Sequence, residues 1–163
     1  MKIIDNILTK EQLNLIQETY LKDTNVPMYY VSGVASKEDN ALGSYCHVHK
    51  IYEYPLGWVS HTQKVIFPIL EYLDVNALIR IKVNFYPRTS KIIQHGLHRD
   101  QTFKCKVALF YVNSNNGFTY LAKEKKKVES VENRILLLNS FDEHNSTTCT
   151  NQNLRCTINI NYF

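Results

Sequence analysis

Glycine and proline are scarce in this sequence, which has 163 residues of which only five are glycine and four are proline. This composition leaves little room for flexible linkers between domains. No run of about 18 apolar residues is present, so no transmembrane helix is expected. The N-terminal segment also turns polar too early for the apolar core of a signal peptide. We therefore expect a single domain over residues 1–163, located in the cytoplasm.

Closely spaced cysteine pairs are also absent. The four cysteines show no CxxC spacing, and we expect them to be reduced and structural: Cys46, Cys105, Cys149 and Cys156. Neither sign of charge dominates, because 19 basic and 15 acidic residues give a net charge of +4. Such a weak excess argues against nucleic acid or a membrane surface as the partner. The one dense basic cluster, KEKKK at 123–127, is interpreted as a solvated hairpin tip.

Apolar and aromatic residues are plentiful, with 44% hydrophobic residues, eleven tyrosines and seven phenylalanines. The chain can therefore bury a substantial core. Thr9 and Gln12 form a capping box, which predicts an amphipathic helix over residues 9–22. Ser60 and Gln63 form a second capping box, which predicts a helix over residues 60–72. Within it, Pro68 either introduces a kink or marks the true first turn.

From residue 78 onward the hydrophobic pattern changes from a helical period to strict alternation. Five segments have the composition of strands: 78–87, 107–112, 118–121, 134–139 and 154–163. The sequence Asn115-Asn116-Gly117 predicts a turn between the second and third of them. Helices followed by short strands indicate a mainly β fold with flanking helices, either an antiparallel barrel or a jelly roll.

The segment HGLHRDQTF contains the sequence His98-Arg99-Asp100. Side chains two residues apart on an extended chain project to the same side, so His98 and Asp100 can converge on one point. One more histidine would complete a facial triad of two histidines and one carboxylate, which suits Fe(II). His144, which follows the apolar strand RILLLN, is the best candidate. The alternative is an ordinary polar turn before a buried strand.

Arg155 lies on the last predicted strand and shares a face with Thr157, opposite Cys156 and Ile158. An arginine inside a barrel is costly unless an anion meets it. A dicarboxylate would satisfy this need, with one end on the metal and the other paired with the guanidinium. A face directed to solvent explains the alternation equally well.

The order His98-x-Asp100, His144, Arg155-x-Thr157 resembles the iron(II) and 2-oxoglutarate dependent oxygenases, whose fold is a double-stranded β-helix, a cupin-like jelly roll. Within that superfamily, residues 78–163 resemble the small prolyl-4-hydroxylase-like enzymes of bacteriophages. Four segments support the resemblance: LIRIKVNFYPRT, ALFYVNSNNGFT, KVESVENRILLLN and RCTININYF. It implies a catalytic jelly-roll core over 76–163, supported by helix and strands over 1–75, and a phage or bacterial host cytoplasm as the location.

The same resemblance implies a set of site residues. The catalytic metal ligands would be His98, Asp100 and His144. The residues that bind 2-oxoglutarate would be Asn84, Tyr86, Thr157 and Arg155, with the Tyr86 hydroxyl reaching a carboxylate. The implied cofactors are Fe(II) and 2-oxoglutarate, with O2 as cosubstrate and ascorbate as a supporting reductant.

The implied activity is hydroxylation of an unactivated C–H bond in a prolyl or other residue of a peptide or protein, with a small molecule as another substrate class. Oxidative demethylation of a nucleic-acid base, or a non-catalytic binding protein with a vestigial site, are the alternatives. The remaining histidines are interpreted as structural: His47-x-His49 as a surface-facing strand pair, His61 in a first helical turn, and His95 in the loop before the triad, at the pocket mouth.

Overall fold

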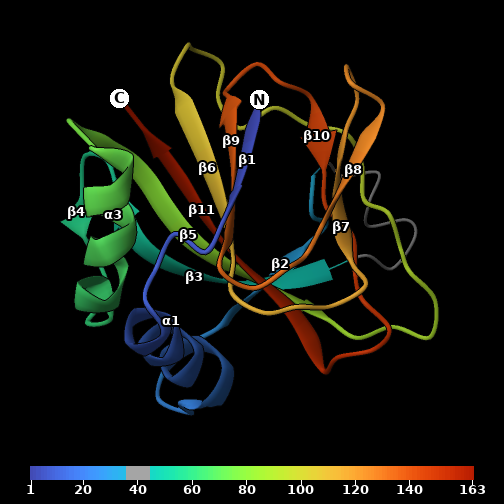
Figure 1. The fold of residues 1–163 in the computed structure, drawn as a ribbon, viewed down its shortest axis with the longest axis horizontal. Helices are drawn as coiled ribbons and strands as arrows, with labels where there is room; N and C mark the ends of the chain where they lie inside the picture. The colour runs from blue at the N-terminus through green and yellow to red at the C-terminus, as the bar shows by residue number, and fades with distance from the viewer. Residues whose placement is uncertain (36–44) are drawn as a thin grey trace.

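The computed structural model describes residues 1–35 and 45–163, and over these residues the chain forms two antiparallel sheets (Figure 1). The larger sheet has eight strands, ordered β1 (Lys2–Asp5), β9 (Arg134–Asn139), β6 (Lys106–Tyr111), β11 (Leu154–Tyr162), β5 (Leu78–Pro87), β3 (Tyr45–Glu53) and β2 (Tyr29–Ser32), with β4 (Gly57–Trp58) paired to β3. The smaller sheet has the order β10 (His144–Asn145), β7 (Phe118–Leu121) and β8 (Lys126–Glu129). The predicted mainly β jelly roll with flanking helices is confirmed.

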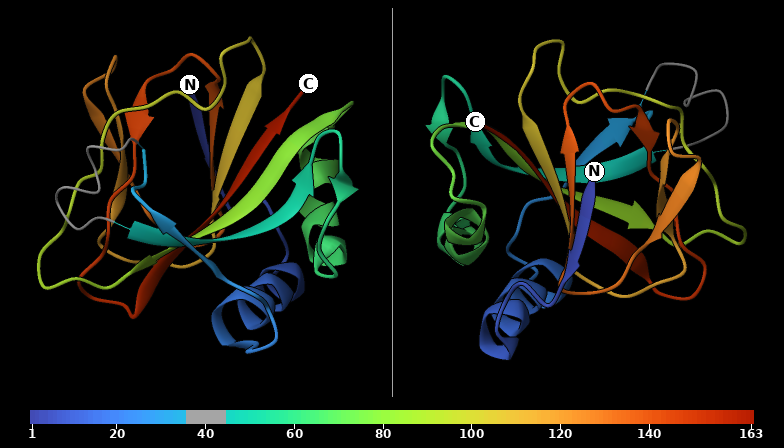
Figure 2. Two further views of the ribbon diagram at one scale, coloured as in Figure 1. Left: turned by 180° about the vertical axis from the view of Figure 1, so that it is seen from behind. Right: turned by 45° about the horizontal axis from the view of Figure 1, so that its top comes forward.

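The larger sheet separates two layers. In both views of Figure 2, helices α1 (Lys10–Gln17) and α3 (Phe67–Leu73) lie on one side of it, and the smaller sheet lies on the other. On the helix side, alternate residues of β5 and β11 pack against both helices in one buried apolar cluster. Its members include Leu13, Ile16, Ile69, Ile81, Val83, Phe85, Cys156, Ile158 and Ile160. This layer is a continuous hydrophobic core.

The layer between the two sheets is apolar in only one half. There β6 and β9 pack against β7 and β8 through a second cluster that includes Val107, Leu109, Leu121, Val128 and Leu136. In the other half, the inward residues of β5 and β11 are polar, and Asn84, Thr157 and Asn159 are all buried. Polar side chains of this kind need partners when they are buried. The jelly roll therefore contains a polar cavity beside an apolar core.

The first predicted helix is confirmed together with its cap. The Gln12 amide N–H donates to the Thr9 hydroxyl at 3.3 Å, and the Thr9 amide N–H donates to the Gln12 side chain at 2.9 Å. After α1 the helix continues as a π-helical turn, Glu18–Lys22. The prediction for 9–22 was therefore correct in extent.

The second predicted helix is shorter than expected. A 3-10 turn, Gln63–Ile66, precedes α3, and Pro68 lies in the first turn of α3. The predicted cap at Ser60 is wrong, because its hydroxyl accepts from the Thr62 amide two residues away at 3.0 Å instead. Proline lacks the N–H that a helix interior requires, so Pro68 fits in the first turn of a helix but not further along it. The α-helix accordingly begins at Phe67.

Three of the predicted strands match β5, β7 and β9 at both ends, and the other two match β6 and β11 within one residue. The predicted turn at 115–117 connects β6 to β7, but these strands belong to different sheets, so it is a crossing and not a hairpin. The Lys-rich segment lies where it was expected. Strands β7 and β8 form a hairpin, and residues 123–127 at its tip are exposed.

The interpretation of His47 and His49 as a surface pair is wrong for His49, which is only 3% exposed. Its Nδ1 lies 2.8 Å from the Pro27 carbonyl, and its Nε2 lies 2.7 Å from the Ser60 hydroxyl. Burial lowers the pKa of His49. This histidine therefore links β3 to two loops. His47 lies on the same face of β3 as His49, but it is only partly buried and makes an edge contact with Tyr30.

All four cysteines are free and buried, as the sequence predicted. Burial raises the pKa of the Cys156 thiol, which keeps it protonated. Among the helices that the structure describes, none has both the length and the hydropathy needed to span a bilayer.

Asn133 fastens the N-terminal segment to the sheet, and its replacement is expected to be costly. Its side chain accepts from the Leu8 amide and donates to the Leu8 carbonyl, both at 2.9 Å, from a backbone at φ 59°. Asn133→Ala would leave both buried groups unpaired, so we expect a loss of about 2–4 kcal/mol in the free energy of unfolding. Urea denaturation measures it, with Asn153→Ala as the exposed control. Equal stability of the two variants would contradict this role.

Candidate active site

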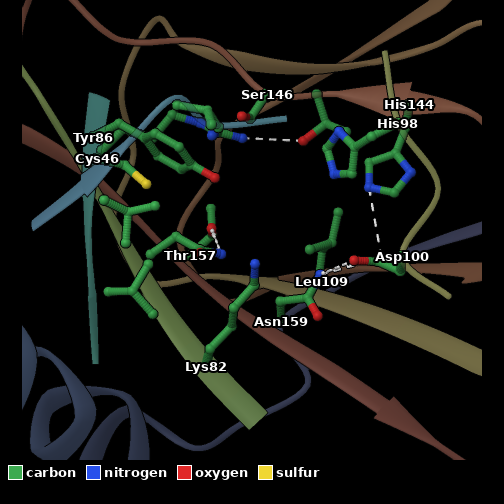
Figure 3. Close-up of a pocket in the computed structure, with 16 residues that line it drawn as sticks. Cys46, Lys82, Tyr86, His98, Asp100, Leu109, His144, Ser146, Thr157 and Asn159 are labelled. Atoms are coloured by element: carbon green, nitrogen blue, oxygen red, sulfur yellow. Dashed lines mark hydrogen bonds and ion pairs between the residues drawn. The ribbon is translucent and has the colours of Figure 1, made fainter. Parts of the chain in front are cut away.

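The two halves of the predicted metal triad are joined by a short backbone bridge. The His98 amide donates to the His144 carbonyl at 2.9 Å, and the His144 amide donates back at 3.1 Å. This bridge brings one ligand-capable atom from each of His98, Asp100 and His144 within 4.8 Å of one another (Figure 3). The structure therefore brings together the three residues that the His98-x-Asp100 pattern and the family resemblance predicted.

Both histidine rings are oriented by backbone carbonyls. Nδ1 of His144 lies 2.9 Å from the Asp142 carbonyl, and Nδ1 of His98 lies 3.4 Å from the Gly96 carbonyl. Because a carbonyl only accepts, these contacts favour the tautomer with the proton on Nδ1. The Nε2 lone pair of each ring is then available to a metal, an arrangement typical of histidine ligands.

The Asp100 carboxylate is held by two neighbours. The Asn159 amide donates to its two oxygens at 3.2 and 3.3 Å, and Arg80 Nη2 lies 3.3 Å from Oδ1. Burial, with a smaller contribution from His144, lowers the pKa of His98 to about 4. His98 is therefore neutral at neutral pH, the state in which imidazole binds a metal.

Arg155 is 1% exposed, so the alternative of a face directed to solvent is wrong. Its Nε donates to the Ser130 hydroxyl at 2.7 Å, and its Nη2 donates to the Thr119 hydroxyl at 3.0 Å. The guanidinium carbon also lies 5.2 Å from the centre of the Tyr86 ring. All these partners are neutral, and no carboxylate of the described residues pairs with Arg155. A buried cation with only neutral partners indicates a binding site for an anion.

The other predicted residues lie in the same cavity as the triad and Arg155. The Asn84 amide is 3.5 Å from the Thr157 hydroxyl, as expected for facing residues of β5 and β11. Tyr86 is buried, and burial raises its pKa to about 12, so its hydroxyl is protonated. His95 is not at the pocket mouth. It is 3% exposed and stacks on Tyr86 at 5.4 Å between ring centroids.

Sequence reasoning missed the groups that position Arg155. Ser130 and Thr119 are far from it in sequence and belong to no recognisable motif. Gly117 is equally important, because a Cβ there would lie 2.6 Å from Arg155 Cδ and 2.7 Å from the Thr148 carbonyl oxygen. Asn159 could have been found, because it shares the inward face of β11 with Arg155.

Neither the family models nor the curated protein sequences yield a match to this chain. Solved structures do. A prolyl hydroxylase from Trichoplax adhaerens, solved with a peptide of the hypoxia inducible factor oxygen degradation domain, has a TM-score of 0.69 at 17% identity and covers 99% of this chain and 82% of that chain. A Pseudomonas putida prolyl-4-hydroxylase has a TM-score of 0.63 at 12% identity, covering 99% and 91%.

A third similar structure is the viral collagen prolyl hydroxylase of Paramecium Bursaria Chlorella virus-1, in complex with 2-oxoglutarate. Its TM-score is 0.63 at 10% identity, and it covers 98% of this chain and 93% of that chain. At these identities the likeness is one of fold. The chain thus has the jelly-roll fold of 2-oxoglutarate and iron(II) oxygenases, including bacterial and viral prolyl hydroxylases, and the resemblance predicted from the sequence is confirmed at that level.

Removal of any triad residue is expected to abolish tight binding of a divalent metal. For His144→Ala or Asp100→Asn we expect the affinity for Mn(II) or Fe(II), measured by anaerobic calorimetry, to fall by about 100-fold or more. Metal at 100 times its dissociation constant should stabilise the wild type by about 2.7 kcal/mol and these variants far less. His47→Ala is the histidine control. Metal affinity that survives in the triad variants would refute the site.

Proposed function

We propose that this chain is an iron(II) and 2-oxoglutarate dependent dioxygenase that hydroxylates an unactivated C–H bond. One observation carries the proposal. The cluster of His98, Asp100 and His144 shares a cavity with a buried guanidinium, that of Arg155, which has no acidic partner among the described residues. A metal site and an anion site in one cavity are what a chelating dicarboxylate requires.

The donor set fits iron(II). Two imidazoles and one carboxylate on one side of an ion leave further positions open, which is the arrangement of non-haem iron oxygenases. His98 and His144 would bind through Nε2, while their Nδ1 atoms keep the carbonyl contacts described above. Asn159 and Arg80 would hold Asp100 in the orientation it needs as a ligand.

The rest of the cavity fits 2-oxoglutarate. Its remote carboxylate would form a forked, charge-assisted pair with Arg155, helped by the Thr157 hydroxyl and the neutral Tyr86 hydroxyl. Asn84 would line the cavity beside the bound 2-oxoglutarate. Two of the similar structures were solved with 2-oxoglutarate, the viral collagen hydroxylase and, with nickel also bound, HygX from Streptomyces hygroscopicus.

Bound iron(II), with O2 and 2-oxoglutarate, supplies the oxidising power that inserts one oxygen atom into a C–H bond and leaves succinate and carbon dioxide. The chain supplies position and shielding. Asp100 balances one charge of the metal, and Arg155 anchors the far end of the cosubstrate. Leu109 and Val48 cover parts of the cavity wall with apolar surface, which limits access of water.

For the substrate we propose a prolyl or other residue of a peptide or protein. Similar structures include one bound to a peptide fragment of hypoxia inducible factor and one named for collagen. We further propose that residues 1–163 act as one catalytic domain. The two alternatives are oxidative demethylation of a nucleic-acid base and a vestigial, non-catalytic site. The assay described next distinguishes both from hydroxylation of a peptide.

An anaerobic mixture of the protein with iron(II) and 2-oxoglutarate is expected to develop a weak visible charge-transfer band. On admission of O2, proline-rich peptides should gain one oxygen atom by mass spectrometry while succinate accumulates. Loss of a methyl group from methylated single-stranded nucleic acid would instead support demethylation. A protein that binds the metal but shows no band and forms no succinate would be vestigial, contrary to the proposal.

Arg155→Lys is expected to weaken 2-oxoglutarate binding while keeping the charge. Lysine cannot form the forked pair, so we expect the dissociation constant to rise about 10- to 100-fold. Calorimetry with the manganese(II)-loaded protein measures the change, and circular dichroism checks folding. Arg99→Lys serves as the matched control, because Arg99 is half exposed and pairs with Glu143. Equal affinities in both variants would exclude Arg155 as the partner of the cosubstrate.

A further inference from the structure

Lys82 is a cation that lines the cavity, and the proposed binding of the metal and of the cosubstrate does not involve it. It lies on the inward face of β5, directly opposite Asn159 of β11, and it lines the cavity together with His98 and Asp100. Figure 3 shows its side chain rising from β5 with the amino group directed into the open space, on the side of Thr157 and Asn159. Burial lowers the pKa of Lys82, so the site bears a cost for its charge.

Among the described residues, two carboxylates, Asp100 and Glu53, act on the charge of Lys82, and each is paired with another group. Asp100 is held by Arg80 and Asn159, and it is the proposed metal ligand. Glu53 lies 3.0 Å from the Lys50 ammonium. Within residues 1–35 and 45–163, the Lys82 ammonium forms neither an ion pair nor a hydrogen bond. No group in this part of the chain therefore compensates the positive charge of Lys82.

Charge balance in the loaded cavity leads to the same conclusion. The two positive charges of iron(II) and the two negative charges of 2-oxoglutarate cancel. Among the described residues that line the cavity, the cations Arg155 and Lys82 then stand against one carboxylate, that of Asp100, which is also paired with Arg80. The cosubstrate has only two anionic ends, and both are engaged, one at the metal and one at Arg155. Lys82 therefore faces whatever else enters the cavity, which is the substrate.

We propose that Lys82 binds a carboxylate of the substrate and thereby selects acidic substrates for this site. A single ammonium beside neutral amides suits one negative charge better than the two of a phosphate. The carboxylate would lie close to the oxidised carbon, as in a prolyl residue with an acidic neighbour or a small molecule with a free carboxylate. This inference rests on the proposed function, and it makes Lys82 a specificity-determining residue that takes no part in holding the metal or 2-oxoglutarate.

Pairs of probes that differ only in one charge test the inference. We would titrate N-acetylated, C-amidated Glu-Pro-Gly, Gly-Pro-Glu and their glutamine counterparts, and also N-acetylproline and N-acetylprolinamide. The acidic peptides carry the carboxylate on a glutamate side chain next to proline, whereas N-acetylproline carries it on the proline itself. The two sets of probes therefore distinguish an acidic neighbour in a peptide from the free carboxylate of a small molecule. Calorimetry would use protein loaded with manganese(II) and 2-oxoglutarate, so that binding is measured without turnover.

In the wild type we expect the acid of at least one pair to bind about tenfold more tightly than its amide, the usual size of one charge-assisted contact. In Lys82→Met this preference should fall to within about twofold, whereas Lys82→Arg should keep part of it. Lys50→Met is the matched control, because Lys50 faces Lys82 across β3 and β5 but is exposed and paired with Glu53. The control should retain the full preference.

The affinity for 2-oxoglutarate is measured first in every sample. If the wild type fails to bind 2-oxoglutarate, the proposed function fails and this inference falls with it. If 2-oxoglutarate binds but no acid is preferred, or the preference persists in Lys82→Met, only the role of Lys82 is overturned. A loss of 2-oxoglutarate affinity in Lys82→Met would also overturn it, because Lys82 would then belong to the cosubstrate site.

Discussion

The antiparallel register between β5 and β11 is the constraint on which the whole site depends. It sets Tyr86 opposite Arg155, Asn84 opposite Thr157, and Lys82 opposite Asn159. Because side chains alternate along a strand, this register sends every polar residue of the pair to the same side. The apolar residues between them go to the opposite side, against the helices. One pairing therefore builds the polar wall of the cavity and the hydrophobic core behind it.

That polar wall is held in place by apolar packing elsewhere. An isolated cation in a protein interior carries an effective penalty of several kcal/mol. The described residues that line the cavity include two cations, Lys82 and Arg155, but one carboxylate, Asp100. Hydroxyl groups of Ser130 and Thr119 and the ring of Tyr86 offset part of this penalty at the guanidinium. Apolar packing in the two hydrophobic clusters, one on each side of the larger sheet, offsets the remainder of the penalty. The fold is therefore stable enough to hold buried cations whose charge a bound anion would balance.

The sequence predicted most accurately those features that depend on local pattern. The alternation in β5, ended by Pro87, defined both its limits and its faces. The His98-x-Asp100 pattern, together with the family resemblance that added His144, identified three residues that meet in space. Features set by distant partners were missed or mistaken. Strands β1 and β8 carry no clear apolar period, the fit of Gly117 against Arg155 has no local signature, and His49 is buried by residues from two other segments.

The glycine in the crossing between the two sheets links two positions that are far apart in the sequence. Position 117 has room only for a hydrogen atom because the aliphatic stem of Arg155 and a backbone carbonyl fill the space beside it. Descendants of this chain that acquire a larger residue at 117 would have to redirect the side chain at 155 and also shift the backbone carbonyl of Thr148. Evolution at position 117 is therefore tied to two distant segments at once, so the glycine is expected to persist as long as Arg155 keeps its present place.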